Sequence, residues 1–307
     1  MTLKNHKIAV LKGGPGSERA VSLKSAESVT EALRSLGADV LEIDVTSHEV
    51  TVPADVLIAV NMIHGTFGED GELQALLEQQ GVAYTGAGVA TSQVAFDKVL
   101  SKRKFLDAGV PTPRSQVLRL DGEDQLELAL PVVVKPPCEG SSVGVFIVRT
   151  KEELAAALEG SKKYGTETLV EEFIEGRELT VGVLGDEALP VIHIEPVSGF
   201  YDINNKYPWM SGTGKTLYHC PADLDARVTD RVQRAALAAM KAIGVEVYGR
   251  VDVMLNRDGE PYVLEINTIP GMTVSSLLPK AARVAGLDFP QLMERIIELS
   301  LKARGRG

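Results

Sequence analysis

Hydrophobic and polar residues alternate along residues 1–96 in a way that predicts strands and helices in turn. Short apolar runs predict buried strands, and apolar residues spaced three and four apart predict amphipathic helices. The expected elements are strands at 8–11, 40–43 and 56–60, a helix between an N-cap at Ser17 and a stop at Gly37, and a helix at 71–80. This alternation favours an open parallel sheet, whose ligands lie beyond the carboxyl ends of the strands. Two polar clusters, 13–18 and 64–71, follow such strand ends.

After residue 96 the expected strands and helices no longer alternate regularly. A compact α+β unit is therefore expected over 97–177 and a third unit over 178–307. A helix is expected around Asp97 and Lys98, and Thr150 with Glu153 forms a capping box that opens another. The remaining expected elements are strands at 132–135, 143–148, 169–174, 179–184 and 189–194, and helices at 121–130, 152–158, 225–243 and 289–303. The chain is therefore interpreted as three domains, because 307 residues exceed what one hydrophobic core usually serves.

Composition restricts the class of protein. Apolar residues make up 44% and charged residues 24%, which is typical of a soluble globular protein. The net charge of −10 argues against a nucleic-acid partner. No signal peptide and no apolar stretch of ~20 residues is evident, so neither secretion nor a membrane partner is expected. Two cysteines, Cys138 and Cys220, fit a reducing compartment, and a cytoplasmic protein is expected.

A hairpin near the C-terminus carries the first chemical signal. Asp258-Gly259 lies between two alternating segments and is a preferred two-residue turn. Counting back from this turn places Asp252 opposite Glu265. Two residues further from the turn, Arg250 lies opposite Asn267 on the same face, because side chains alternate with period two.

Opposed carboxylates repel each other unless a cation lies between them. Oxygen ligands from Asp252, Glu265 and Asn267 suit Mg²⁺, which proteins usually hold with one or two carboxylates and substrate phosphates. The alternative is a solvated hairpin with incidental charges. The hairpin therefore favours a magnesium-phosphate site.

A second signal lies in the loop that follows the apolar strand at 132–135. Lys135 ends this strand, and residues 136–144 form a small, polar turn with glycines. Glycines allow the backbone to approach a phosphate, hydroxyls donate hydrogen bonds, and the lysine supplies positive charge. The alternative is a β-hairpin loop with a lysine that extends along the surface.

These motifs together resemble the ATP-grasp superfamily and, within it, the D-alanine:D-alanine ligases. The residues that carry the superfamily resemblance are Lys98, Lys135 with Glu-Gly-Ser-Ser-Val-Gly at 139–144, Val170-Glu171, Gly176, Glu178, and Arg-Val-Asp at 250–252 with Glu-Ile-Asn-Thr-Ile-Pro-Gly-Met at 265–272. The ligase resemblance adds the motifs at 64–71, 84–86, 200–202, 206–207, 220–222 and 270–273. The resemblance covers residues 7 to 300. It implies an ATP-grasp fold with an N-terminal substrate-side α/β domain (1–96), a central small domain (97–177) and a C-terminal domain with the metal site (178–307).

The resemblance also implies a reaction and its cofactors. Such enzymes transfer the γ-phosphate of ATP to the carboxylate of one D-alanine, which gives an acyl phosphate. The amine of a second D-alanine then attacks this acyl phosphate, and the dipeptide formed is used for peptidoglycan precursor synthesis. The implied nucleotide-binding residues are Lys98, Lys135, Glu171, Ile174, Glu178 and Lys206. The implied ligands of two Mg²⁺ ions, or Mn²⁺ in their place, are Asp252, Glu265 and Asn267. A monovalent cation is compatible with the family, and a homodimer is expected.

Substrate-side roles follow from the same resemblance. Glu18 is expected to bind the ammonium of the first D-alanine, and His64 to lie near its carboxylate. Ser141 and Tyr207 are expected to form hydrogen bonds that link them to Glu18. Arg250 and the Gly271 N–H are expected to stabilise the oxyanion. Ser276 and Leu277 are expected to bind the carboxylate of the second substrate. From the residues alone, Glu18 is a helix-dipole acid, and only the resemblance favours the binding role. The alternatives for the other two residues are a core histidine for His64 and a structural partner of a metal-site carboxylate for Arg250.

Some positions depart from the family pattern, and other functions stay open. Gly16 and Ala20 stand where many relatives carry Ser and Glu, and Cys138 is unusual beside the phosphate loop. The alternatives are a sister ligase that uses D-serine or D-lactate, a nucleotide-binding dehydrogenase and a non-catalytic nucleotide-binding protein. Tyr207 argues against the D-lactate version. Residues 200–216 are expected to form a mobile lid.

Overall fold

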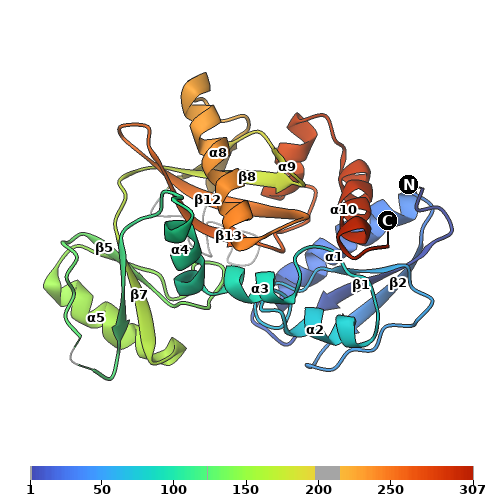
Figure 1. Ribbon diagram of the computed structural model, residues 1–307, viewed down its shortest axis with the longest axis horizontal. Coiled ribbons are helices and arrows are strands. Elements are labelled where there is room, and N and C mark those ends of the chain that lie inside the picture. Colours follow the sequence, from blue (N-terminus) through green and yellow to red (C-terminus); the bar gives the residue numbers. More distant parts are fainter. Residues whose placement is uncertain (1, 123, 198–214, 307) are drawn as a thin grey trace.

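The computed structural model describes residues 2–122, 124–197 and 215–306 and contains three sheets that follow one another along the chain (Figure 1). One sheet falls in each of the three expected domains, whose boundaries stay a prediction. Within these described ranges, no helix combines the length and hydropathy that a membrane span needs.

The first sheet is parallel and has the order β2-β1-β3. Its elements are β1 (Lys7–Gly13), α1 (Arg19–Ser35), β2 (Asp39–Val45), β3 (Ile58–Asn61), α2 (Glu72–Gln79) and α3 (Val89–Phe96). The expected open parallel α/β unit is therefore confirmed. The N-cap prediction for α1 is wrong by one residue, since Glu18 and not Ser17 occupies that position. Gly37 has φ +80° just beyond the helix, which explains why the helix stops there.

The second sheet is antiparallel, with the order β4-β7-β5-β6, and has a small core of its own. The elements of this part of the chain are α4 (Lys98–Asp107), β4 (Ser115–Arg119), β5 (Val132–Lys135), β6 (Phe146–Val148), α5 (Lys151–Ser161), the 3₁₀ turn η1 (Lys162–Tyr164) and β7 (Glu167–Glu172). The capping box of Thr150 and Glu153 is present at the start of α5.

The acidic helix predicted at 121–130 is wrong. The described residues of this segment form no helix. Instead, Gln116 on β4 exchanges two hydrogen bonds with the segment, through the Gln125 carbonyl and the Glu127 N–H. Leu126, Leu128 and Leu130 pack against the core of the sheet. Apolar residues at every second position are typical of an extended segment, and this spacing outweighs the acidic composition that suggested a surface helix.

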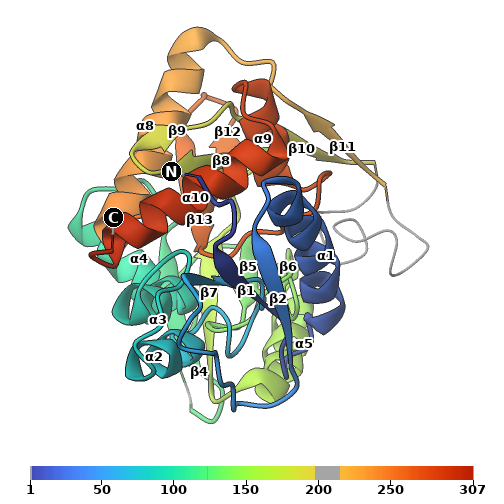
Figure 2. The same ribbon diagram turned by 90° about the vertical axis from the view of Figure 1, so that its right-hand side faces the viewer.

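The third sheet carries the C-terminal part of the chain and has the order β11-β10-β8-β12-β13, with β9 paired to β8. Its strands are β8 (Gly176–Leu184), β9 (Glu187–Ala188), β10 (Ile192–Pro196), β11 (Thr216–His219), β12 (Tyr248–Asn256) and β13 (Pro261–Asn267). The helices that accompany it are α8 (Ala226–Ile243), α9 (Leu277–Val284) and α10 (Phe289–Ala303). Helices α9 and α10 share one hydrophobic core with β1, β3 and α1, so the two ends of the chain pack together (Figure 2).

The hairpin of β12 and β13 has the predicted register at its far end but not the predicted turn. Asn256 N–H donates to the Glu260 carbonyl (3.0 Å), so that three residues form the loop, with Gly259 at φ +78°. A β-bulge at Leu264 adds one residue to β13, which shifts the strand pairing by one residue and restores the predicted register beyond the bulge. Asp252 therefore lies opposite Glu265, as predicted, although the two-residue turn is wrong.

Candidate active site

Two cavities meet at the β12–β13 hairpin. The larger, of about 460 Å³, is lined by Asp252 and Glu265 and lies between the second and third sheets. The smaller, of about 340 Å³, is lined by Arg250 and Asn267 and lies between the N-terminal unit and the third sheet. One face of a single hairpin thus supplies side chains to both cavities, because residues two apart on a strand point to the same side.

Lys98 from α4 and Lys135 from β5 bring positive charge to the larger cavity, and Lys102 of α4 lies behind its wall. Lys98 and Lys102 lie one helical turn apart on the same face of α4, where Asp97 caps the helix through its side chain. Lys98 Nζ donates to the Glu139 carbonyl (2.6 Å) of the loop after β5 and lies 3.3 Å from Glu265 Oε2. The predicted loop and the predicted metal ligand are therefore joined through Lys98.

Glu171 on β7 is buried between two of these lysines. Its carboxylate oxygens lie 2.8 Å from Lys102 Nζ and 2.8 Å from Lys135 Nζ. Burial by itself raises the pKa of the Glu171 carboxyl, but the two ammonium groups more than offset this and lower it. Burial also lowers the pKa of Lys102, whose ammonium donates to Thr112 Oγ1 and the Pro113 carbonyl. This buried ion triad fixes Lys135 at the wall of the cavity.

Part of the lining of the larger cavity is apolar and comes from two facing sheets. Val133 and Ile147, which are paired in the second sheet, contribute one side, and Met254 and Leu264 of the hairpin contribute the other. The other predicted residues that line this cavity are Ile174 and Glu178. Apolar side chains together with charged groups in one cavity suit an aromatic ring attached to an anionic tail.

Asp252 is held by three neighbours at the junction of the cavities. Thr180 Oγ1 donates to Asp252 Oδ1 (2.7 Å), and Asn267 Nδ2 donates to Oδ2 (3.1 Å). Arg250 forms a bidentate ion pair with the same carboxylate, at 3.0 and 2.9 Å. The structural role that the sequence left open for Arg250 is therefore present, while its side chain also lines the smaller cavity.

Glu18 projects into the smaller cavity from the start of α1. Ser141 Oγ donates to Glu18 Oε1, and Ser141 itself has φ +51°. A Cβ added at Gly65 or Gly140 would come within 2.7 or 2.8 Å of Glu18 Oε2. The two glycines therefore leave the room that the carboxylate occupies. The predicted link between Glu18 and Ser141 is present in the structure.

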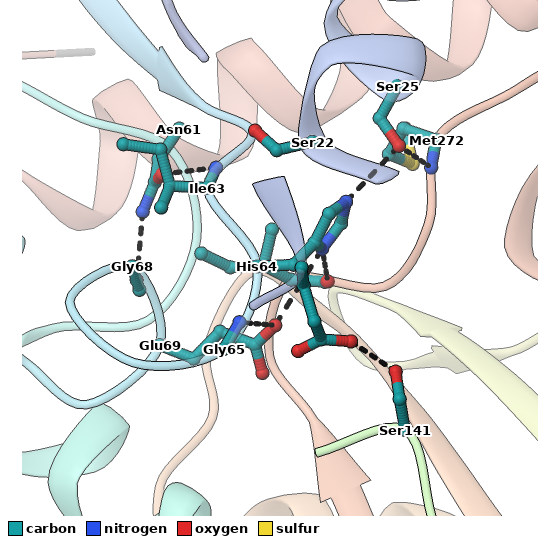
Figure 3. A network of polar contacts seen from close by, with 12 residues as sticks. Ser22, Ser25, Asn61, Ile63, His64, Gly65, Gly68, Glu69, Ser141 and Met272 are labelled. Atoms are coloured by element: carbon teal, nitrogen blue, oxygen red, sulfur yellow. Dashed lines mark hydrogen bonds and ion pairs between the residues drawn. The ribbon is translucent and has the colours of Figure 1, made fainter. Parts of the chain in front are cut away.

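His64 lies at the centre of a buried network between the two ends of the chain (Figure 3). Its Nδ1 lies 2.8 Å from the Ile269 carbonyl, and its Nε2 lies 3.1 Å from Ser25 Oγ. Ser25 Oγ in turn accepts from the Met272 N–H (3.2 Å). The imidazole thus fixes the 269–272 loop against α1.

Glu69 is the acidic partner of this histidine. Glu69 Oε1 lies 3.7 Å from His64 Nδ1 and accepts from the Gly65 N–H (3.2 Å). Burial by itself lowers the pKa of the His64 ring, but the carboxylates of Glu69 and Glu18 more than offset this and raise it. The pKa of the Glu69 carboxyl is also raised, first by its burial and then, against the effect of His64, by the charge of Glu18.

The far end of the smaller cavity is formed by the start of α9. Ser276 is the N-cap residue of α9 and Leu277 its first residue, as the predicted helix start requires. Ser276 Oγ accepts from the Thr273 N–H (3.0 Å). Both residues and Gly271 line the cavity. A Cβ at Gly271 would approach Ser276 Oγ to 3.1 Å, so glycine permits this close turn.

The structure brings the predicted site residues that it describes to the two cavities. Lys206 and Tyr207, and the predicted lid at 200–216 up to residue 214, lie outside the described residues. Sequence reasoning missed Ser25, Glu69, Lys102 and Thr180 as contacts of these residues. Two of them carried a signal: Lys102 lies four residues after Lys98, and Glu69 belongs to the polar cluster at 64–71.

Comparisons with known proteins agree with this geometry. The family model described as D-ala D-ala ligase C-terminus matches residues 107–298. The D-alanine--D-alanine ligase of Methylacidiphilum infernorum is 47% identical over 293 residues, which cover 95% of each chain. That of Geobacter sulfurreducens is 44% identical and covers 99% of this chain and 98% of its own. A crystal structure of the D-alanine--D-alanine ligase from Bacillus anthracis complexed with ATP is 33% identical, with a TM-score of 0.85 over 98% of this chain and 99% of its own.

Proposed function

Because the chain belongs to the D-alanine--D-alanine ligase family, we propose that it joins two molecules of D-alanine with the hydrolysis of ATP to ADP and phosphate. The observation that carries this proposal is the meeting of two cavities at one hairpin, since a phosphoryl group must pass from a nucleotide to a carboxylate. The products are D-alanyl-D-alanine, ADP and phosphate, with an acyl phosphate as the intermediate. The dehydrogenase alternative has no support in the family assignment.

The larger cavity is proposed to hold ATP. Lys98 and Lys135 lie where they would bind the phosphates, near the hairpin carboxylates. The apolar walls and Ile174 suit the adenine ring, and Glu178 suits the ribose. Glu171 is expected to contact adenine through the family resemblance, while in this structure it holds Lys102 and Lys135. Lys206 is expected at the γ-phosphate.

The proposed metal ligands are Asp252, Glu265 and Asn267. Their donor set fits Mg²⁺ because two facing carboxylates and an amide oxygen present hard ligands on one face of the hairpin. Two Mg²⁺ ions, or Mn²⁺ in their place, would neutralise charge on the terminal phosphates. Neighbouring side chains hold these ligands in position: Thr180 orients the Asp252 carboxylate, and Lys98 orients Glu265.

The smaller cavity is proposed to hold the two D-alanines. Glu18, fixed by Ser141, would bind the ammonium of the first, and His64 would lie near its carboxylate. Arg250 and the Gly271 N–H would stabilise the oxyanion that forms when the second amine attacks. Ser276 and the start of α9 would bind the carboxylate of the second D-alanine. Tyr207 is expected to complete the link to Glu18.

The proposal is tested by measuring phosphate release with defined amino acids. D-Alanine with Mg²⁺-ATP is expected to give ADP and dipeptide, and L-alanine is expected to give at most background release. Equal release with L-alanine, or AMP as the product, would contradict the assignment. D-Alanine with D-serine or D-lactate in the same assay distinguishes the sister ligases by the dipeptide or depsipeptide formed.

The wider context of the reaction follows from the same proposal. A D-alanyl-D-alanine ligase supplies the dipeptide for peptidoglycan precursors, and its use of ATP fits a place in the cytoplasm. The expected homodimer stays a prediction, and the use of a monovalent cation, with which the family is compatible, stays open. Size-exclusion chromatography with light scattering and an assay with and without K⁺ test them.

A further inference from the structure

A half-buried lysine at the far end of the smaller cavity has no acidic partner among the residues that the structure describes. Lys280 lies in the first turns of α9 and lines this cavity with Ser276 and Leu277. Its Nζ lies 4.5 Å from the centre of the Tyr218 ring on β11. No carboxylate of the described residues forms an ion pair with it. Burial lowers the pKa of its ammonium, against the effect of the nearby Cys220, and Arg283 adds to the decrease. A partly desolvated ammonium without a counter-ion lowers stability unless an anion joins it.

The other basic side chains among the described residues of this cavity have acidic partners, and for His64 this partner is Glu69. Arg250 forms its bidentate ion pair with Asp252, and Lys24 pairs with Glu27 on the exposed side of α1. Among the described residues that line this cavity, Lys280 is therefore the cation whose charge no described carboxylate matches. A cavity that holds two amino acids must also accommodate two carboxylates.

The position of Lys280 defines which carboxylate it meets. Lys280 lies four residues after the N-cap Ser276, and its backbone N–H donates to the Ser276 carbonyl (2.9 Å). Residues four apart lie on the same helix face, so the ammonium and the Ser276 hydroxyl approach the same end of the cavity. Glu18 lies on α1, a different element of the cavity wall. The Tyr218 ring holds the ammonium in place by a cation–π contact.

We propose that Lys280 binds the carboxylate of the second D-alanine and makes that carboxylate a requirement for the attacking substrate. This inference rests on the proposed function and adds a binding residue to Ser276 and Leu277. An acceptor without a negative charge leaves Lys280 unmatched, so the site selects amino acids over neutral amines. Selectivity against an analogue that lacks a charged group is strong when the site's own charge stays unpaired.

The experiment compares D-alanine with D-alaninamide as the second substrate. The amide has an amine but no carboxylate, so it can attack the acyl phosphate and cannot be phosphorylated. Wild type is expected to prefer D-alanine as acceptor. Lys280→Met keeps the length of the side chain and removes its charge. We expect the KM for the second D-alanine to rise about tenfold or more, which is typical of one lost charged hydrogen bond. The KM for ATP and the rate with D-alaninamide are expected to change less than about twofold.

Two further variants separate binding from structure. Lys24→Met removes the same charge from another wall of the same cavity and is expected to leave the second KM within about twofold of wild type. Lys280→Arg keeps the charge and is expected to restore most of the preference for D-alanine. An unchanged second KM in Lys280→Met, or equal losses with D-alanine and D-alaninamide together with a lower Tm, would overturn the inference. Absence of dipeptide with the wild-type protein would instead contradict the proposed function itself.

Discussion

The two cavities are built in different ways, although they share a hairpin. The larger is positioned by ion pairs, with Glu171 buried between two lysines and Lys98 beside Glu265. The smaller is positioned by hydrogen bonds between residues far apart in the sequence, such as His64 to the Ile269 carbonyl, 205 residues away. We infer that removing one partner of a buried ion pair destabilises mainly the nucleotide side, while a small steric change is enough to disturb the substrate side.

The largest effect is expected from Glu171→Gln, which leaves Lys102 and Lys135 without their buried counter-ion. Breaking a buried ion pair by removing one partner costs about 3–5 kcal/mol. Urea unfolding at pH 7 is expected to show this loss in the free energy of unfolding. Because the pKa of Glu171 is lowered in the folded state, its stabilisation is present above the ordinary Glu pKa and is lost as the pH falls through the folded value. The difference between wild type and variant should therefore narrow on acidification.

A control and a contrary result are available for this first prediction. Glu172→Gln changes the neighbouring residue, whose partner Arg114 is largely exposed, and should cost less than about 1 kcal/mol. Equal stability losses in the two variants would show that the buried triad does not organise this wall.

The next effect concerns turnover. Glu265→Gln removes one charge opposite Asp252 with little change in volume, so kcat with Mg²⁺-ATP is expected to fall about 10²-fold or more. Glu195→Gln is the matched control, because Glu195 lines the same cavity from β10 and pairs with His219 instead. It should stay within a few-fold of wild type. Turnover of Glu265→Gln near the wild-type value would exclude Glu265 as a ligand of the reacting metal-phosphate group.

The smallest effect sharpens the substrate side. Gly140→Ala places a methyl group 2.8 Å from Glu18 Oε2, which is the flexible end of a side chain and can move aside. The fold should therefore be preserved, with a Tm close to wild type, while Glu18 leaves its position. We expect the KM for the first D-alanine to rise about tenfold, as for the loss of one charged hydrogen bond, and the KM for ATP to stay unchanged.

Gly122→Ala provides the comparison, since its added Cβ would make only an ordinary contact of 3.5 Å with Arg119. It should change neither KM. If Gly140→Ala instead raised the KM for ATP and left that for D-alanine unchanged, the assignment of Glu18 to the substrate side would be wrong.

The sequence by itself determined the chemistry of the hairpin and the order of the secondary structure. Alternation with period two is a local property, so the shared face of Arg250, Asp252, Glu265 and Asn267 could be predicted without any tertiary contact. The family resemblance added the roles that local patterns do not specify, such as that of Glu18. The helix predicted at 121–130 failed because packing of alternate leucines on a neighbouring sheet outweighed local composition.

The tertiary structure alone decided how these groups are held. The bulge at Leu264 compensates for the wrong turn, and a bulge depends on the strand pairing and not on the turn residues. The contacts of His64 with Ser25 and the 269–272 loop exist because α1 packs with α10 at the opposite end of the chain. Such contacts depend on where distant segments pack, and no pattern along the sequence encodes that distance.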